Sequence, residues 1–186
     1  MIRLKNICKS FGEQSVLRDI SMEFAEGITC IMGPSGVGKT TLINIAAGII
    51  APDCGEIIGL HGKKVSMIFQ EDRLLEWETA LTNVLFVNNN RPRAIELLTQ
   101  AGLADSLHKK AADLSGGMKR RVCLCRALIA QHDLLILDEP FKGLDAEIKP
   151  SIMQMVKDHA NGITICITHD PSEAEFLGGR VISFAS

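Results

Sequence analysis

The feature that most constrains the fold of this chain is a glycine-rich segment that follows an apolar run and precedes a helical pattern. The run at 28–32 predicts a buried strand, and residues 42–47 predict the opening of a helix. Glycines let the backbone between them curl, so that N–H groups point inward at an anion near the helix N-terminus. The segment consists of Gly33, Pro34, Ser35, Gly36, Val37, Gly38, Lys39, Thr40 and Thr41.

This segment also matches the phosphate-binding pattern G-x-x-x-x-G-K-[ST] in the strand-loop-helix context that the pattern requires. In such a loop Lys39 reaches the outer phosphates, and the Thr40 hydroxyl is placed to bind Mg²⁺. A chance match in a chain of this size is on the order of one per cent at an average glycine content of ~7%. The segment therefore predicts a nucleoside-triphosphate site.

A second apolar run ends in two carboxylates. Residues 134–137 are typical of a strand buried on both faces, and Asp138 and Glu139 follow them directly. The carboxyl ends of parallel strands open at the crevice where α/β sheets bind ligands. We therefore expect Asp138 to hold Mg²⁺ and Glu139 to polarise an attacking water. The alternative is a strand that simply ends in solvated acids.

A third segment places Ser115, Gly116 and Gly117 at the start of a helical run that reaches Ala130. The hydroxyl and the glycine amides form another helix N-terminus that suits an anion. Because the first loop already holds the outer phosphate, this second site suggests closure on a nucleotide bound to another subunit. Taken alone, the segment also fits an ordinary Ser-capped helix start.

Short apolar segments alternate with helical patterns along the chain, which predicts an α/β fold with a largely parallel sheet. Between 71 and 112 only helical patterns occur, at 79–87 and 91–101. We expect a single domain over 1–186, with a small helical subdomain at about 71–130 inserted into a core. That core covers 1–70 and 131–186, with strands expected at 2–9, 22–24, 28–32, 65–69, 134–137, 163–168 and 181–184.

Composition excludes several classes of function. A net charge of −2 gives no electrostatic footprint for nucleic acid, and the run 119–121 is interpreted as a solvated basic helix face. The mean hydropathy is +0.17, yet no run approaches the ~18 apolar residues of a membrane span, and the start lacks a signal-peptide core. We expect a cytosolic chain. The spacing of the six cysteines predicts free thiols packed as small hydrophobes rather than disulfides or a zinc site.

In their order, and over nearly the whole chain, these segments resemble the nucleotide-binding subunit of ATP-binding-cassette (ABC) transporters. The resemblance implies a P-loop NTPase core with a mainly parallel sheet, an N-terminal antiparallel β portion and a small inserted helical subdomain. It implies that 33–41 is the Walker A loop, 134–139 the Walker B strand with Glu139 as general base, and 114–118 the signature motif. The implied cofactors are ATP and Mg²⁺.

The resemblance assigns four further roles. Gln70 corresponds to the Q-loop glutamine, which contacts Mg²⁺ and water, and Asp145 lies in the D-loop 143–145, which crosses the dimer interface. His169 corresponds to the switch histidine on the γ-phosphate. Phe11 corresponds to the aromatic residue that stacks on adenine, with Val16 packed beside it.

Residues 69–77, 79–84 and 139–145 are similar to importers of the nitrate/sulfonate/taurine group. This similarity makes 74–77 a candidate docking surface for a membrane partner, although Trp77 also fits a core aromatic residue. The implied partners are a second ABC ATPase subunit, identical or not, a transmembrane permease that docks near Gln70–Trp77, and a solute-binding protein if the transporter imports. The implied location is cytoplasmic, at the inner face of the cell membrane, and no nucleic-acid partner is expected.

The chain departs from the family pattern at three points. Met118 stands where the signature usually ends in Gln, which removes a polar contact near the ribose. The chain has no Tyr, so adenine stacking rests on Phe11. Lys142 places a positive charge before the D-loop, and nothing in the sequence explains it.

Two alternatives to a transport ATPase remain open. One is a soluble, non-transport ABC ATPase in DNA repair, translation or cluster assembly, although the chain has neither a long coiled-coil insertion nor a second cassette. The other is a regulatory nucleotide-binding module with little turnover. The presence of Glu139 and His169 weighs against this module.

Overall fold

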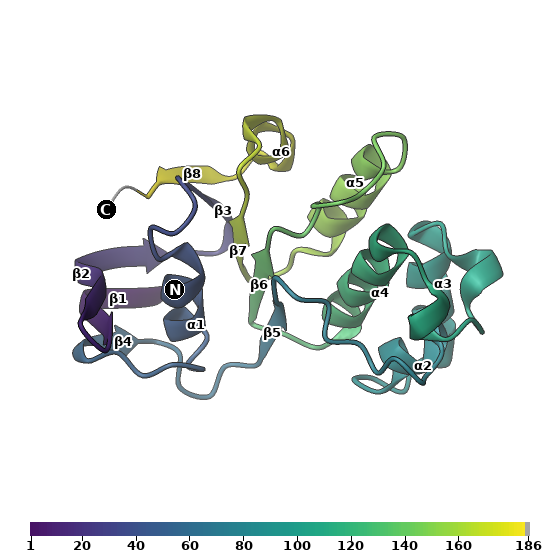
Figure 1. Cartoon of the computed structure of the whole chain (residues 1–186), viewed down its shortest axis with the longest axis horizontal. Coiled ribbons are helices and arrows are strands. Elements are labelled where there is room, and N and C mark those ends of the chain that lie inside the picture. The colour runs from purple at the N-terminus through teal and green to yellow at the C-terminus, as the bar shows by residue number, and fades with distance from the viewer. Residues whose placement is uncertain (185–186) are drawn as a thin grey trace. The chain divides into compact units, whose positions relative to one another are not determined.

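The computed structural model describes residues 1–184 and divides into two compact units (Figure 1). The first unit contains residues 1–65, 132–138 and the segment from Asn161 onward. The second contains residues 66–131 and 139–160. The helical subdomain expected at about 71–130 lies inside the second unit, together with residues 139–160, which the sequence analysis places in the core.

A three-stranded antiparallel sheet forms the N-terminal part of the first unit, in the order β2 (Gln14–Phe24), β1 (Ile2–Phe11) and β4 (Cys54–Ile58). Ile2, Leu4 and Ile7 are buried on its inner face. Strand β4 and the first part of β2 are not predicted from the sequence. Both segments are mostly exposed, and neither carries a long apolar run.

A parallel sheet supports the candidate site in the first unit. Its order is β6 (Leu134–Asp138), β7 (Ile163–Ile167), β3 (Gly27–Met32) and β8 (Arg180–Ser183). All residues of β6 and β7 are buried, as the apolar runs predict for strands covered on both faces. Helix α1 (Lys39–Ala46) follows β3, and α6 (Pro171–Leu177) follows β7.

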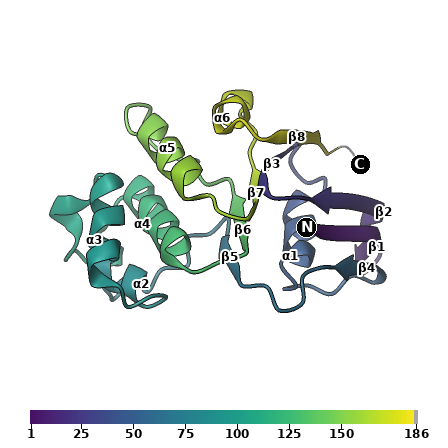
Figure 2. The same ribbon diagram turned by 180° about the vertical axis from the view of Figure 1, so that it is seen from behind.

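The second unit is mainly helical and is built around α4 (Gly116–Ile129). Helices α2 (Ala80–Leu85), α3 (Arg91–Gln100) and α5 (Lys149–His159) each contact α4, and the grouping of α2, α3 and α4 is visible from both sides (Figures 1 and 2). Two short 3-10 turns, η1 (Ala104–Ser106) and η2 (Ala111–Asp113), connect α3 to α4. The chain enters this unit within β5 (Val65–Ile68).

Two helices are absent from the sequence-based assignment. Helix α6 has only seven residues, which is too short to show a helical period. Helix α5 buries Ile152, Met153, Met155 and Val156 on one face, a pattern that is visible in the sequence. Within residues 1–184, no helix is both long enough and apolar enough to span a bilayer.

Candidate functional site

The phosphate-binding loop connects β3 to α1 and depends on glycine at its last turn. Gly38 caps α1 in the left-handed region, with φ of 100°. A Cβ atom at this position would lie 2.9 Å from side-chain carbons of both Val16 and Leu17. Glycine is therefore needed for its conformation and for the close approach of β2. Val16 thus lies against the phosphate-binding loop.

Lys39 is buried and folds back over the loop that precedes it. Its Nζ atom donates hydrogen bonds to the carbonyl oxygens of Gly33, at 2.9 Å, and Pro34, at 2.6 Å. An ammonium group has three donors and no acceptor, so it suits the concave side of a loop that binds phosphate oxygens.

Thr40 and Asp138 meet although they lie 98 positions apart in the sequence. The Thr40 hydroxyl donates to Oδ2 of Asp138 at 3.0 Å, and Asp138 is only 2% exposed at the end of β6. Both residues belong to the first unit. The fold of the first unit thus brings together two of the three residues expected to bind Mg²⁺.

His169 lies beyond the carboxyl end of β7 at the same edge of the sheet, because Asp138 pairs in register with Ile167. The flanking residues are fixed. The buried Thr168 hydroxyl donates to the Glu173 carboxylate, and the Asp170 carboxylate caps α6 by accepting from the Ser172 backbone N–H at 2.9 Å. The imidazole itself is exposed.

Phe11 ends β1 and pairs with Gln14 across the turn to β2. Its ring is 51% exposed, and Lys9 Nζ lies 5.6 Å from the ring centroid. An exposed aromatic face of this kind can stack on a planar base.

In the second unit, three of the expected residues, Gln70, Gly116 and Gly117, line one cavity of about 230 Å³. Ser115 caps α4, with its Oγ atom accepting from the Met118 N–H at 3.3 Å. A Cβ atom at Gly117 would lie 3.0 Å from the Gly143 carbonyl oxygen, so the signature segment and the D-loop run close together. The cavity is lined by Gln70, Asp72, Gly116, Gly117, Arg120, Lys142 and Gly143.

Asp145 lies on the exposed D-loop that leads into α5, and its backbone carbonyl accepts a hydrogen bond from the Lys149 N–H at 3.0 Å. The carbonyl therefore fixes the turn into the helix. The exposed position is compatible with the interface role that the resemblance implies.

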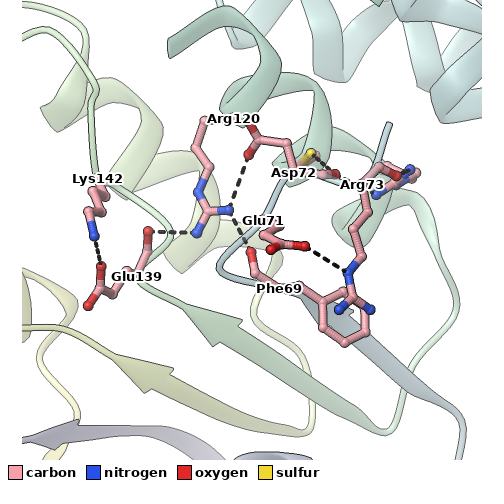
Figure 3. Close-up of polar contacts among 9 residues, drawn as sticks. Phe69, Glu71, Asp72, Arg73, Arg120, Glu139 and Lys142 are labelled. Carbon is pink, nitrogen blue, oxygen red and sulfur yellow. Dashed lines mark hydrogen bonds and ion pairs between the residues drawn. The ribbon is translucent and has the colours of Figure 1, made fainter. Parts of the chain in front are cut away.

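Glu139 has a strained backbone and is held at two points (Figure 3). Its φ of 48° lies in the left-handed region, which is uncommon for residues other than glycine. Its carbonyl oxygen accepts from Arg120 Nη2 at 2.7 Å, and its Oε2 atom forms an ion pair with Lys142 Nζ at 2.8 Å. Strain of this kind is often found at functional sites.

The interpretation of 119–121 as a solvated basic face is wrong for two of its three residues, because Arg120 and Arg121 are buried. Arg120 Nη1 donates to the Phe69 carbonyl at 2.7 Å and pairs with Asp72 at 3.3 Å (Figure 3). Arg121 donates to the Ala101 carbonyl at 2.7 Å. The sequence pattern does not show that a buried guanidinium group can bond to main-chain carbonyls, so a run of charged residues is wrongly interpreted as exposed.

Arg120 is thus a residue of this cluster that sequence reasoning missed. Its guanidinium links the end of β5 to the main chain of Glu139 within the second unit. The available signal was its position in the helix, since the turn that follows it, 122–125, is apolar and buried.

The six cysteines carry free thiols, and four of them are buried. Burial raises the pKa of the Cys123 and Cys125 thiols to about 12 each.

Across residues 1–184, no group of three or more His, Cys, Asp or Glu residues is arranged to hold a metal.

A parallel sheet, a glycine-rich loop that leads into a helix, a buried lysine in that loop and a threonine hydrogen-bonded to a strand-end aspartate together define a P-loop nucleotide-binding protein. Within this class the chain belongs to the ABC transporter family, whose model matches residues 17–142.

Curated relatives extend the match over the whole chain. The chain is 38% identical over 200 residues to the aliphatic sulfonates import ATP-binding protein SsuB 2 of Burkholderia cenocepacia. The alignment covers 100% of this chain and 74% of that protein. It is 40% identical over 186 residues to SsuB of Pseudomonas entomophila, covering 94% of this chain and 69% of that protein.

Solved structures agree with this assignment. The dimeric bacterial ABC transporter cassette MJ0796 matches with a TM-score of 0.88 and 30% identity, over 99% of this chain and 94% of that one. A dimeric post-hydrolysis state of MJ0796, bound to ADP and Pi, matches with a TM-score of 0.85 and 29% identity. It covers 99% of this chain and 94% of that one. The chain is therefore an ATP-binding and ATP-hydrolysing subunit of an ABC transporter.

Proposed function

We propose that this chain powers the import of a small anionic solute, with aliphatic sulfonates as the first class to test. The observation that carries the ATPase part of this proposal is the pairing of Thr40 with Asp138 beside the phosphate-binding loop. The direction of transport and the solute class are supported by the names of the relatives, which are sulfonate import proteins.

Binding of ATP uses the first unit. The amides of 33–41 and the Lys39 ammonium surround the phosphates, since backbone N–H groups and a helix N-terminus favour anions. The Phe11 ring stacks on adenine, with Val16 beside it. The exposed Phe11 ring and the close approach of Val16 to Gly38 support these assignments.

Thr40, Asp138 and Gln70 would hold Mg²⁺, all three through oxygen atoms, which are the ligands that this cation prefers. Their donor chemistry fits, and the Thr40–Asp138 pair shows that two of them converge. When bound, Mg²⁺ neutralises charge on the phosphate oxygens.

Glu139 acts as the general base in hydrolysis. Its carboxylate takes a proton from water as the water oxygen attacks the γ-phosphorus. The bond between the γ-phosphorus and the bridging oxygen breaks, and ADP leaves with the electron pair. His169 contacts the γ-phosphate and stabilises the charge that develops there.

Two cassettes work as a pair. The segment 115–117 of one copy closes on ATP bound to the second copy, and the D-loop residue Asp145 lies at the interface between them. The capped start of α4 and the similarity to dimeric cassettes support this arrangement. The second copy is either identical to this chain or a paralogue.

A transmembrane permease docks on the segment 70–77 and places the chain at the inner face of the membrane. A solute-binding protein delivers the solute to the permease from outside. Trp77 supports this surface because it is 68% exposed, which is unusual for a large aromatic residue. The alternative interpretation of Trp77 as a core residue is wrong.

The test is an affinity pull-down of tagged Glu139→Gln from gently solubilised native cells with Mg-ATP, combined with ATPase assays on the purified variant. We expect lost turnover, a long-lived ATP-bound dimer and co-purification of a multi-span membrane protein. The exposed Glu147→Gln provides the matched control and should hydrolyse ATP normally. Recovery of soluble partners alone would favour the non-transport ATPase, and unchanged hydrolysis by Glu139→Gln would refute its role as base.

A further inference from the structure

The carboxylate of Glu139 is not the isolated acid that a general base is expected to be. Its Oε2 atom lies 2.8 Å from the Nζ atom of Lys142, three positions along the same turn (Figure 3). The Lys142 side chain is 65% exposed, whereas that of Glu139 is 16% exposed. The lysine therefore approaches the carboxylate from solvent.

The main chain of Glu139 is already fixed without this ion pair. Arg120 donates to its carbonyl oxygen at 2.7 Å, and the Lys142 backbone N–H donates to the same oxygen at 3.3 Å. The carboxylate is a second point of contact, separate from the carbonyl oxygen. The ammonium of Lys142 restrains that side chain directly.

An ammonium on the carboxylate opposes its use as a base. A water molecule that gives up its proton must first donate a hydrogen bond to the carboxylate, and Lys142 competes with that water as a donor to Oε2.

We propose that Lys142 is a positioning residue that restrains Glu139 through this ion pair and so lowers the rate of ATP hydrolysis. The inference rests on the proposed function, because it takes Glu139 as the general base. It accounts for the positive charge before the D-loop that the sequence left unexplained.

The test compares three purified variants with the unmodified chain under steady-state and single-turnover conditions. Lys142→Met removes the charge, Lys142→Arg retains it, and Arg93→Met breaks another ion pair of the same unit at the same spacing, between Arg93 and Glu96 at 2.7 Å. Because pairs with an exposed partner are weak, we expect Lys142→Met to raise kcat roughly two- to fivefold. KM for ATP should stay the same, and Lys142→Arg and Arg93→Met should match the unmodified chain.

The double variant Glu139→Gln with Lys142→Met separates this inference from the proposed function. If Lys142 acts through Glu139, the substitution at 142 has no effect once the base is gone. An unchanged or lower kcat in Lys142→Met, or an equal rise in Arg93→Met, overturns the restraint while leaving Glu139 as the base. Normal hydrolysis by Glu139→Gln alone overturns both.

Discussion

Charged side chains that bond to main-chain carbonyls fix the geometry of both units at the level of single residues. Lys39 bonds to two carbonyls of its own loop, Arg120 to those of Phe69 and Glu139, and Arg121 to that of Ala101. Hydrogen bonds to carbonyl oxygens help to offset the cost of burying a cation. These three side chains stabilise turns that have no helix or sheet hydrogen bonds to stabilise them.

Replacing Lys39 by Ala should weaken ATP binding, because a charge-assisted hydrogen bond contributes about 1.5–3 kcal/mol, or roughly ten- to hundredfold in affinity. Calorimetric titration with ATP measures the change. Lys110→Ala, at an exposed position of the second unit, serves as the control and should bind normally. Retained affinity in Lys39→Ala would contradict its role at the phosphates.

Replacing Arg120 by Met should lower the free energy of unfolding by about 2–4 kcal/mol, since carbonyls of Phe69 and Glu139 lose their buried donor. Urea denaturation gives the value, and Arg91→Met at an exposed position should change it little. A loss below about 0.5 kcal/mol, the range of ordinary surface substitutions, would show that these hydrogen bonds are not important for stability.

At the level of elements, the sequence identifies the strands that carry an apolar segment. The apolar runs of β6 and β7 predict buried strands correctly, and the segments at 2–9 and 181–184 locate most of β1 and of the more exposed β8. Strand β4 and the start of β2 lie on the exposed antiparallel sheet, where pairing with β1 rather than composition determines the structure. Pairing between distant segments cannot be deduced from either segment alone.

Asp170, the N-cap residue of α6, directly follows His169, so the start of this helix lies next to a residue of the candidate site. Asp170 accepts from the Ser172 N–H, and Gly178 ends the helix in the left-handed region with φ of 67°. Asp170→Ala should lower the free energy of unfolding by ~1 kcal/mol, the usual cost of losing such a cap. Hydrogen exchange should speed up in α6 first. Unchanged exchange there would show that the cap does not stabilise the helix.

For the whole molecule, the sequence predicts the chemistry of the site better than its surroundings. The Thr40–Asp138 contact follows from the loop pattern and the buried strand, because both lie at the carboxyl edge of one sheet. The burial of Arg120 and the Lys142–Glu139 pair could not be predicted, since each depends on how a turn of the second unit folds back on α4. The roles of the site residues remain predictions until variants are measured.

The distribution of thiols over the whole fold gives a further prediction. Cys54 is exposed, although a hydrogen bond with Cys8 raises the pKa of its thiol. Burial raises the pKa of Cys123 and Cys125 to about 12 and so leaves almost no reactive thiolate there at pH 8. Iodoacetamide should therefore modify Cys54 first in the native protein, and faster as the pH rises. Mass spectrometry identifies the site. Early labelling of Cys123 or Cys125 would indicate that α4 opens, and all six thiols should react in denaturant.

The position of Trp77 makes the chain its own optical probe. It is the single tryptophan of a sequence without tyrosine, so one exposed indole accounts for almost all of the intrinsic fluorescence. That indole lies on the segment proposed to meet the permease. Covering it with a membrane protein would shift the emission to shorter wavelengths, whereas events far from it would leave the spectrum largely unchanged. Assembly of the transporter could then be followed in real time without any attached dye.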